Sequence, residues 1–155
     1  MRNTYLKVVI ICFLVLIVLY GMSTWFAPGS YPYREEYVLN VSESTLIEAI
    51  QDFKKNNPQY IVPMQTQLTD GRDNENFRDH WYHIYFYYED ENRIVHYWTR
   101  PAENGKTTFA FIGIIQGLEL GSNWKRINKD FKRSENKEEK KKFEERILNK
   151  IKEKL

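Results

Sequence analysis

The chain has 155 residues, a length that suits one domain plus a short appendage. Hydrophobic residues make up 42% and aromatic residues 15%, which excludes a chain that is disordered throughout. The net charge of +2 combines an acidic body with a basic end: residues 28–124 carry 8 Lys or Arg against 14 Asp or Glu, and residues 125–155 carry 13 against 7. Because nucleic-acid binding needs a basic stripe through the folded body, we expect no nucleic-acid partner.

The first 27 residues predict a membrane anchor. No charged side chain occurs in residues 8–27, and these 20 residues would rise about 30 Å as a helix, the thickness of the hydrocarbon core of a bilayer. Arg2 and Lys7 precede this run, which by the positive-inside rule places the folded part outside the cytoplasm, on the periplasmic side in a bacterium. We therefore expect a single-pass membrane protein.

A cleaved signal peptide is the alternative for the same segment. Gly21 and Ser23 could be the small residues that precede a cleavage site. The apolar run nevertheless continues into Trp25 and Phe26, which suit a membrane interface better than the polar region before a cleavage site. We favour the uncleaved anchor, and both interpretations put the folded part in the same compartment.

Residues 28–34 are expected to form a Pro-containing linker, and residues 35–133 an α+β domain outside the cytoplasm. Apolar residues alternate with others over residues 37–41, which predicts a strand. Ser42 is a suitable N-cap for a helix whose apolar residues recur at helical spacing as far as Phe53.

The remainder of the domain is expected to form an antiparallel β-meander. Residues 59–68 contain at most a short edge strand, because Pro63 interrupts them. Over residues 80–116, β-rich runs alternate with turn residues, of which Asn104-Gly105 is the strongest turn signal. Residues 134–155 predict a charged amphipathic helix. The predicted fold is therefore α+β: an N-terminal transmembrane helix, then a small domain with an antiparallel meander and two flanking helices.

One stretch, residues 80–100, holds all three histidines and eight aromatic residues. A turn at Asp90-Glu91 would pair residues whose numbers sum to 181, and would place His83 opposite Trp98 on the same face as Tyr85 and His96. This face is the candidate partner-binding surface, because Trp, Tyr and Arg dominate interface hot spots. Its predicted residues are Trp81, His83, Tyr85, Tyr87, His96, Trp98, Arg100 and Phe111.

The next predicted turn places a glycine beside one of the histidines. A turn at Asn104-Gly105 would pair His96 with Gly113 and Trp98 with Phe111. Gly113 would then leave a notch beside His96 for a ligand or another chain, although a glycine inside a strand can equally mark a bulge. Because the sheet is apolar on both faces, the sequence leaves open whether a helix covers this surface.

The sequence disfavours metal binding and catalysis. Only His83 and His96 share a face, while His80 points the other way, and a catalytic zinc site usually needs three protein ligands. The acidic loop over residues 70–79 lacks the regular spacing of a calcium-binding loop. The chain also lacks the common hydrolase, P-loop, zinc-protease and dinucleotide-binding motifs. We therefore expect no metal, no cofactor and no enzymatic activity.

Three functional hypotheses follow from these patterns. The leading one is a membrane-anchored protein-binding or envelope accessory domain outside the cytoplasm, a class that includes immunity proteins, which presents the aromatic sheet face to a protein partner. The alternative is a small-ligand or glycan binder that uses the Trp and Tyr side chains as a platform. The least favoured is a metal enzyme or hydrolase centred on His83 and His96.

Overall fold

A computed structural model describes residues 13, 31–72, 81–121 and 123–155 of the chain. The chain divides into two compact units, Met1–Pro32 and Tyr33–Leu155. In the part of the chain that the structure describes, no helix is long and apolar enough to cross a membrane. The predicted anchor over residues 1–27 lies outside the described residues, apart from Phe13.

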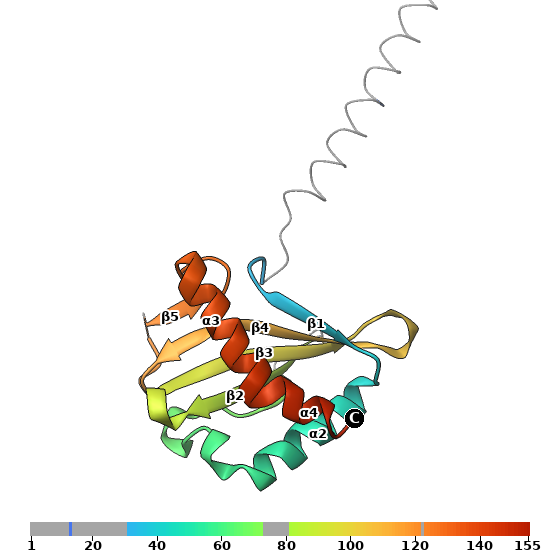
Figure 1. Cartoon of the computed structure of the whole chain (residues 1–155), viewed down its shortest axis with the longest axis horizontal. Coiled ribbons are helices and arrows are strands. Elements are labelled where there is room, and N and C mark those ends of the chain that lie inside the picture. Colours follow the sequence, from blue (N-terminus) through green and yellow to red (C-terminus); the bar gives the residue numbers. More distant parts are fainter. Residues whose placement is uncertain (1–12, 14–30, 73–80, 122) are drawn as a thin grey trace, which may run out of the picture. The chain divides into compact units, whose positions relative to one another are not determined.

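The second unit is built on an antiparallel sheet of five strands (Figure 1). Strands β1, β4, β3 and β2 lie side by side in that order, and β5 also pairs with β4. Because β3 occupies one side of β4 along its whole length, β1 and β5 share the other side, beside the first and second halves of β4. The strands are β1 (Glu35–Leu39), β2 (Tyr82–Tyr88), β3 (Arg93–Pro101), β4 (Thr107–Gln116) and β5 (Trp124–Arg126).

The helices pack on one face of this sheet (Figure 1). Helix α2 (Glu43–Asn56) begins as predicted at Ser42, whose side-chain oxygen accepts the N–H of Thr45 at 3.2 Å. The C-terminal rod consists of α3 (Arg133–Phe143), a π-helical segment (Glu144–Leu148) and α4 (Asn149–Lys152). At its start, the N–H of Lys132 donates to the Glu135 carboxylate at 3.1 Å. The predicted α+β domain with an antiparallel sheet and flanking helices is thus confirmed.

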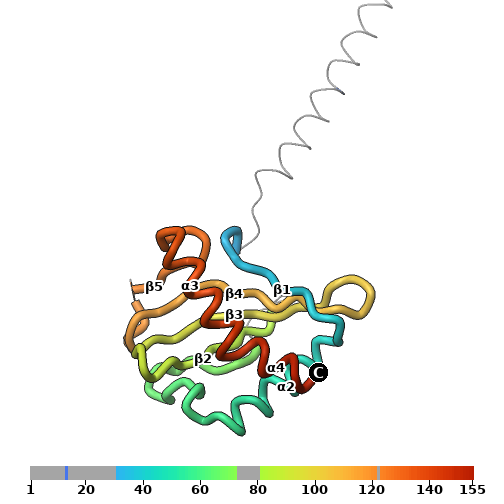
Figure 2. The backbone as a smooth tube through the Cα atoms, in the orientation of Figure 1, coloured from blue at the N-terminus to red at the C-terminus, as the bar shows by residue number. Residues whose placement is uncertain are grey.

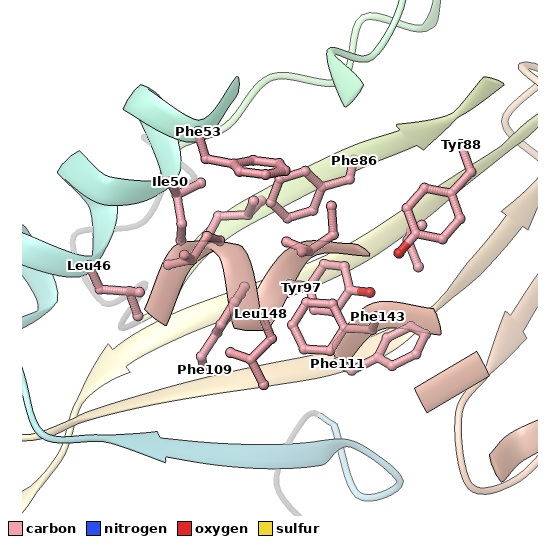
Figure 3. Close-up of a cluster of buried hydrophobic side chains, with 14 of the residues drawn as sticks. Leu46, Ile50, Phe53, Phe86, Tyr88, Tyr97, Phe109, Phe111, Phe143 and Leu148 are labelled. Atoms are coloured by element: carbon pink, nitrogen blue, oxygen red, sulfur yellow. The ribbon is translucent and has the colours of Figure 1, made fainter. Parts of the chain in front are cut away.

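The main core lies between the helices and the sheet face that carries Phe86, Tyr97, Phe109 and Phe111, here called the helix face (Figure 3). Phe143 of α3 stacks on Tyr97 of β3, with ring centroids 4.3 Å apart. Both rings are fully buried, as are the apolar side chains that α2 and α4 contribute to the same cluster. The C-terminal helix therefore shares one core with the sheet, because its apolar stripe completes the cover over this face.

The first hairpin has the predicted register, whereas the second departs from it. His83 pairs with Trp98 and Tyr85 with His96, around a turn at Glu89–Glu91. His96 pairs with Gly113 as predicted, but at the β-bulge beside His96 and Tyr97 the residue Ile112 of β4 has no partner in β3. The register shifts there by one residue, so that Trp98 pairs with Ala110. The predicted pairing of Trp98 with Phe111 was wrong for this reason, since a single extra residue reverses which face each side chain occupies.

Phe111 accordingly leaves the predicted contact surface. It pairs with Tyr97 and lies on the helix face, where its ring is 4.8 Å from Tyr97 and 5.9 Å from Phe143. Figure 3 shows it inside the main core. Phe111 is a packing residue.

The segment after α2 also differs from the sequence-based expectation. In place of an edge strand, residues 58–68 contain two short 3₁₀ turns, Pro58–Tyr60 and Met64–Thr66. Pro58 begins the first turn and Pro63 precedes the second, because proline lacks an N–H and fixes φ for a turn. Short 3₁₀ turns also close both hairpins, at Glu89–Glu91 and Glu103–Gly105. Strand β5 forms in a segment for which the sequence pattern predicted no element. Figure 2 follows the connection from α2 along the outer edge of β2.

Candidate functional site

A histidine pair forms the centre of the sheet face opposite the helices, here called the histidine face and defined by His83, Tyr85, His96 and Trp98. Nδ1 of His83 lies 2.9 Å from Nε2 of His96, so one nitrogen donates a hydrogen and the other accepts it. Tyr85 stacks on the His96 ring with centroids 4.6 Å apart and planes 12° apart. Trp124 of β5 meets the same ring edge-on at 5.3 Å. Side chains from β2 and β5 thus enclose His96.

His96 is too buried to act as a surface acid or base. Its side chain is 5% exposed, and burial, together with the neighbouring His83, lowers its pKa to about 3. The ring is therefore neutral at neutral pH, and its contact with His83 links β3 to β2. Such a pair functions as a polar bond inside an aromatic cluster.

The notch predicted beside His96 is filled by the chain itself. A Cβ placed on Gly113 would overlap the backbone carbonyl oxygen of Lys125 and lie 3.2 Å from Cα of Arg126. Both residues belong to β5, whose backbone passes directly against Gly113. Glycine is required here because another strand approaches closely, so the predicted opening for a ligand was wrong.

Trp98 is a packing residue as well. Its side chain is 1% exposed and its ring lies 6.2 Å from that of Trp81. The guanidinium carbons of Arg34 and Arg100 lie 5.7 and 5.8 Å from the Trp98 ring. Of the residues around this indole, Arg100 is exposed, which leaves its charge accessible at the margin of the face.

Four residues of the predicted surface remain partly exposed, and they line up along β2 and the residue before it. This row, here called the β2 rim, consists of Trp81, His83, Tyr85 and Tyr87. The Tyr87 hydroxyl donates to the side-chain carbonyl of Asn92 at 3.0 Å, which fixes the ring at the hairpin end. His80 and the acidic residues 73–79 lie outside the described residues, so the predicted orientation of His80 stays a prediction.

The outer edge of β2 is paired by a mixture of backbone and side chains. Gly71 exchanges two backbone hydrogen bonds with His83, of 2.7 and 3.0 Å. The next residue of β2 whose backbone faces outward is Tyr85. Its N–H donates to the Asp70 carboxylate at 3.0 Å, and its carbonyl oxygen accepts a hydrogen bond from the Lys54 ammonium at 2.6 Å. Lys54 and Asp70 also bind each other at 2.5 Å. Together these two side chains replace the backbone of a neighbouring strand.

A pocket of about 540 Å³ lies beside this edge, between α2 and the connection that follows it. Sequence reasoning missed it, because residues 59–68 were considered only as an edge strand. The available signal was a cluster of apolar residues in a segment whose prolines disfavour a strand. Its walls are mainly apolar, and the residues that line it are Gln51, Lys54, Lys55, Ile61, Val62, Met64, Gln67, Leu68, Thr69, Asp70 and Tyr85.

The pocket and the β2 rim meet at Tyr85, which lines the pocket and stacks on His96. Burial lowers the pKa of Lys54 at the pocket wall, although the carboxylate of Asp70 acts in the opposite direction. Within the described ranges, no group of three or more His, Cys, Asp or Glu side chains is arranged to hold a metal ion. The chain matches no family model, and no characterised protein or solved structure matches it.

Proposed function

We propose that the chain is a membrane-anchored binding domain that lies outside the cytoplasm and presents the β2 rim to a protein partner. Envelope accessory proteins and immunity proteins are examples of this class. The uncharged apolar run over residues 8–27, preceded by Arg2 and Lys7, supports the anchor and its orientation. The partner is a protein and not a nucleic acid, since the body of the chain is acidic.

The observation that carries this proposal is the row of partly exposed aromatic side chains on an edge strand. Trp81, Tyr85 and Tyr87 are rigid, amphipathic side chains, and the exposed guanidinium of Arg100 lies at the margin of the same face. Aromatic residues and arginine are the types most enriched in interface hot spots. The rim is attached to a packed sheet, so a partner would meet a surface that is already ordered.

Binding is favoured over catalysis by the state of the histidines. His96 is buried and neutral, and its Nε2 already contacts His83. A general acid or base has to reach the proton that it transfers. His96 instead contributes packing, which supports the neighbouring rim.

Photo-crosslinking in native membranes tests the partner. A photoreactive phenylalanine derivative at Tyr87 should give a discrete adduct with one protein, and the same substitution at Tyr85 should give the same adduct. The matched control is Glu145, whose side chain is 62% exposed in the helical layer; it should give none. Absence of an adduct from both rim positions, or equal adducts from all three positions, would contradict the proposed surface.

Cysteine labelling tests the orientation independently. In a Cys12→Ser background, a Ser134→Cys variant carries its only thiol on an exposed turn of α3. A membrane-impermeant maleimide should label it in cells whose cytoplasmic membrane is intact. Labelling that appears only after this membrane is lysed would place the domain in the cytoplasm.

A further inference from the structure

The pocket beside the β2 edge has walls that suit an aliphatic chain. Apart from Tyr85, its apolar lining is aliphatic: Ile61, Val62, Met64 and Leu68. Ile61 is 50% exposed and Met64 is 95% exposed, so these two lining residues keep much of their apolar surface accessible. Methionine adapts its shape to irregular apolar partners. The volume of about 540 Å³ is within the range of about 300–1,000 Å³ found for small-molecule sites.

The charges around the pocket favour an anion. Lys54 and Asp70 neutralise each other at 2.5 Å, and the Lys54 ammonium also lies 4.7 Å from the centroid of the Phe86 ring. Lys55, the next residue of α2, lines the same pocket and is exposed. With two lysines and one aspartate among its lining residues, the pocket carries a net charge of +1. A ligand with an apolar tail and one negative charge would complement both features.

We propose that this pocket binds a single-chain amphiphile with an anionic head group, such as an alkyl carboxylate. The alkyl chain lies against Ile61, Met64 and Leu68, and the carboxylate faces the ammonium of Lys55. Lys54 remains with Asp70 and Tyr85, because its hydrogen bonds close the edge of β2. This proposal does not rest on the protein partner proposed above, although Tyr85 belongs to both the pocket and the β2 rim.

The chain provides a direct reporter for such binding. Its methionines are Met1, Met22 and Met64, so Met64 is the only one in the unit that forms the sheet. Methyl-¹³C labelling of methionine in the full chain, held in phosphatidylcholine nanodiscs, gives a Met64 signal that a Met64→Leu variant assigns. Dodecanoate, added below its micellar concentration, should shift this signal saturably. Dodecylamine and dodecanol should bind up to about fivefold more weakly by the same signal, because they lack the one exposed ion pair with Lys55.

Two charge-reversal variants complete the test. Lys55→Glu should weaken dodecanoate binding about fivefold, because an exposed attraction is replaced by repulsion. Lys137→Glu makes the same change of net charge on an exposed lysine of α3 and should leave binding unchanged. The proposal is overturned by the absence of a saturable shift, by equal responses to carboxylate, amine and alcohol, or by equal effects of the two variants. A Met64 shift caused by phosphatidylglycerol nanodiscs alone would identify a bilayer lipid as the occupant and would likewise overturn it.

Discussion

His96 is the residue at which the fold should respond most directly to pH. Its pKa is lowered from 6.5 to about 3 in the folded chain, so the unfolded chain binds the additional proton. Above pH 6.5 neither state binds this proton, and the free energy of unfolding has its full value. Part of it is lost as the pH falls from 6.5 towards 3. Between these limits one proton separates the two states, and the free energy of unfolding should fall by about 1.4 kcal/mol per pH unit.

Urea unfolding at several values between pH 7 and 5 checks this prediction, since the carboxylates titrate mainly below that window. In a His96→Gln variant the pH dependence should be flatter by about 1 kcal/mol per unit on average over this window, because glutamine carries no titrating group. A variant with the slope of the natural chain would show that His96 is not the responsible group.

Gly113 is important for a different reason, because the backbone of β5 passes directly against it. Gly113→Ala should destabilise the fold by about 1–3 kcal/mol, because the new methyl group meets the backbone of β5 and not a movable side chain. Gly121→Ala is the matched control, since a Cβ at that position has nothing within 4 Å. Urea unfolding should separate the two variants. Equal stabilities would mean that β5 does not lie against Gly113.

At the scale of elements, the outer edge of β2 decides whether the sheet can pair with another chain. An edge strand with free backbone groups invites pairing with another chain. Gly71 covers His83, and the pair Asp70 and Lys54 covers Tyr85. Gly71 and Asp70 of the connection after α2, together with Lys54 of that helix, therefore form an edge guard that covers the outer backbone groups of β2.

Removing the guard should cause association. Asp70→Ala leaves the Tyr85 N–H without its acceptor and Lys54 without its counter-charge, so we expect concentration-dependent oligomers in sedimentation velocity. Asp70→Asn retains an oxygen for the Tyr85 N–H and should associate less. Thr69→Ala alters an exposed neighbour and should remain like the natural chain. Three variants with the same sedimentation behaviour would argue against an edge guard.

At the scale of the whole molecule, ion pairs and buried apolar side chains hold the C-terminal rod against the sheet. Arg93 and Glu139 are both buried and pair at 3.0 Å, and Arg146 binds Asp90 through two hydrogen bonds of 3.0 Å. These contacts tie the rod to the first hairpin. Beyond them, Ile147, Leu148 and Ile151 are at most 1% exposed in the main core.

A chain that ends after Arg146 should therefore fail to fold. It retains the ionic contacts but loses three buried aliphatic side chains, worth about 5–9 kcal/mol in total, against a typical stability of about 5–15 kcal/mol. A chain that ends after Lys152 loses only exposed residues and should keep a cooperative unfolding transition. Circular dichroism during thermal unfolding distinguishes them. A cooperative transition in the shorter chain would show that the ionic contacts suffice.

Much of the local structure could be predicted because it depends on neighbours in sequence. Ser42 caps its helix through an atom three residues away, and the register of the first hairpin follows from a short turn. The bulge after His96 could not be predicted, because a bulge depends on how β4 fits between its neighbours. The pocket escaped prediction for a similar reason, since its walls come from α2, β2 and the connection between them.

The sequence by itself determined the α+β class, the antiparallel meander and the meeting of His83 with His96, because periodicity and short turns act over a few residues. Only the tertiary structure decided which aromatic residues are accessible. Side chains of β2 and β5 enclose His96, the bulge moves Phe111 into the helix face, and the backbone of β5 fills the space beside Gly113. Exposure depends on contacts between segments distant in the chain, which residue patterns do not encode.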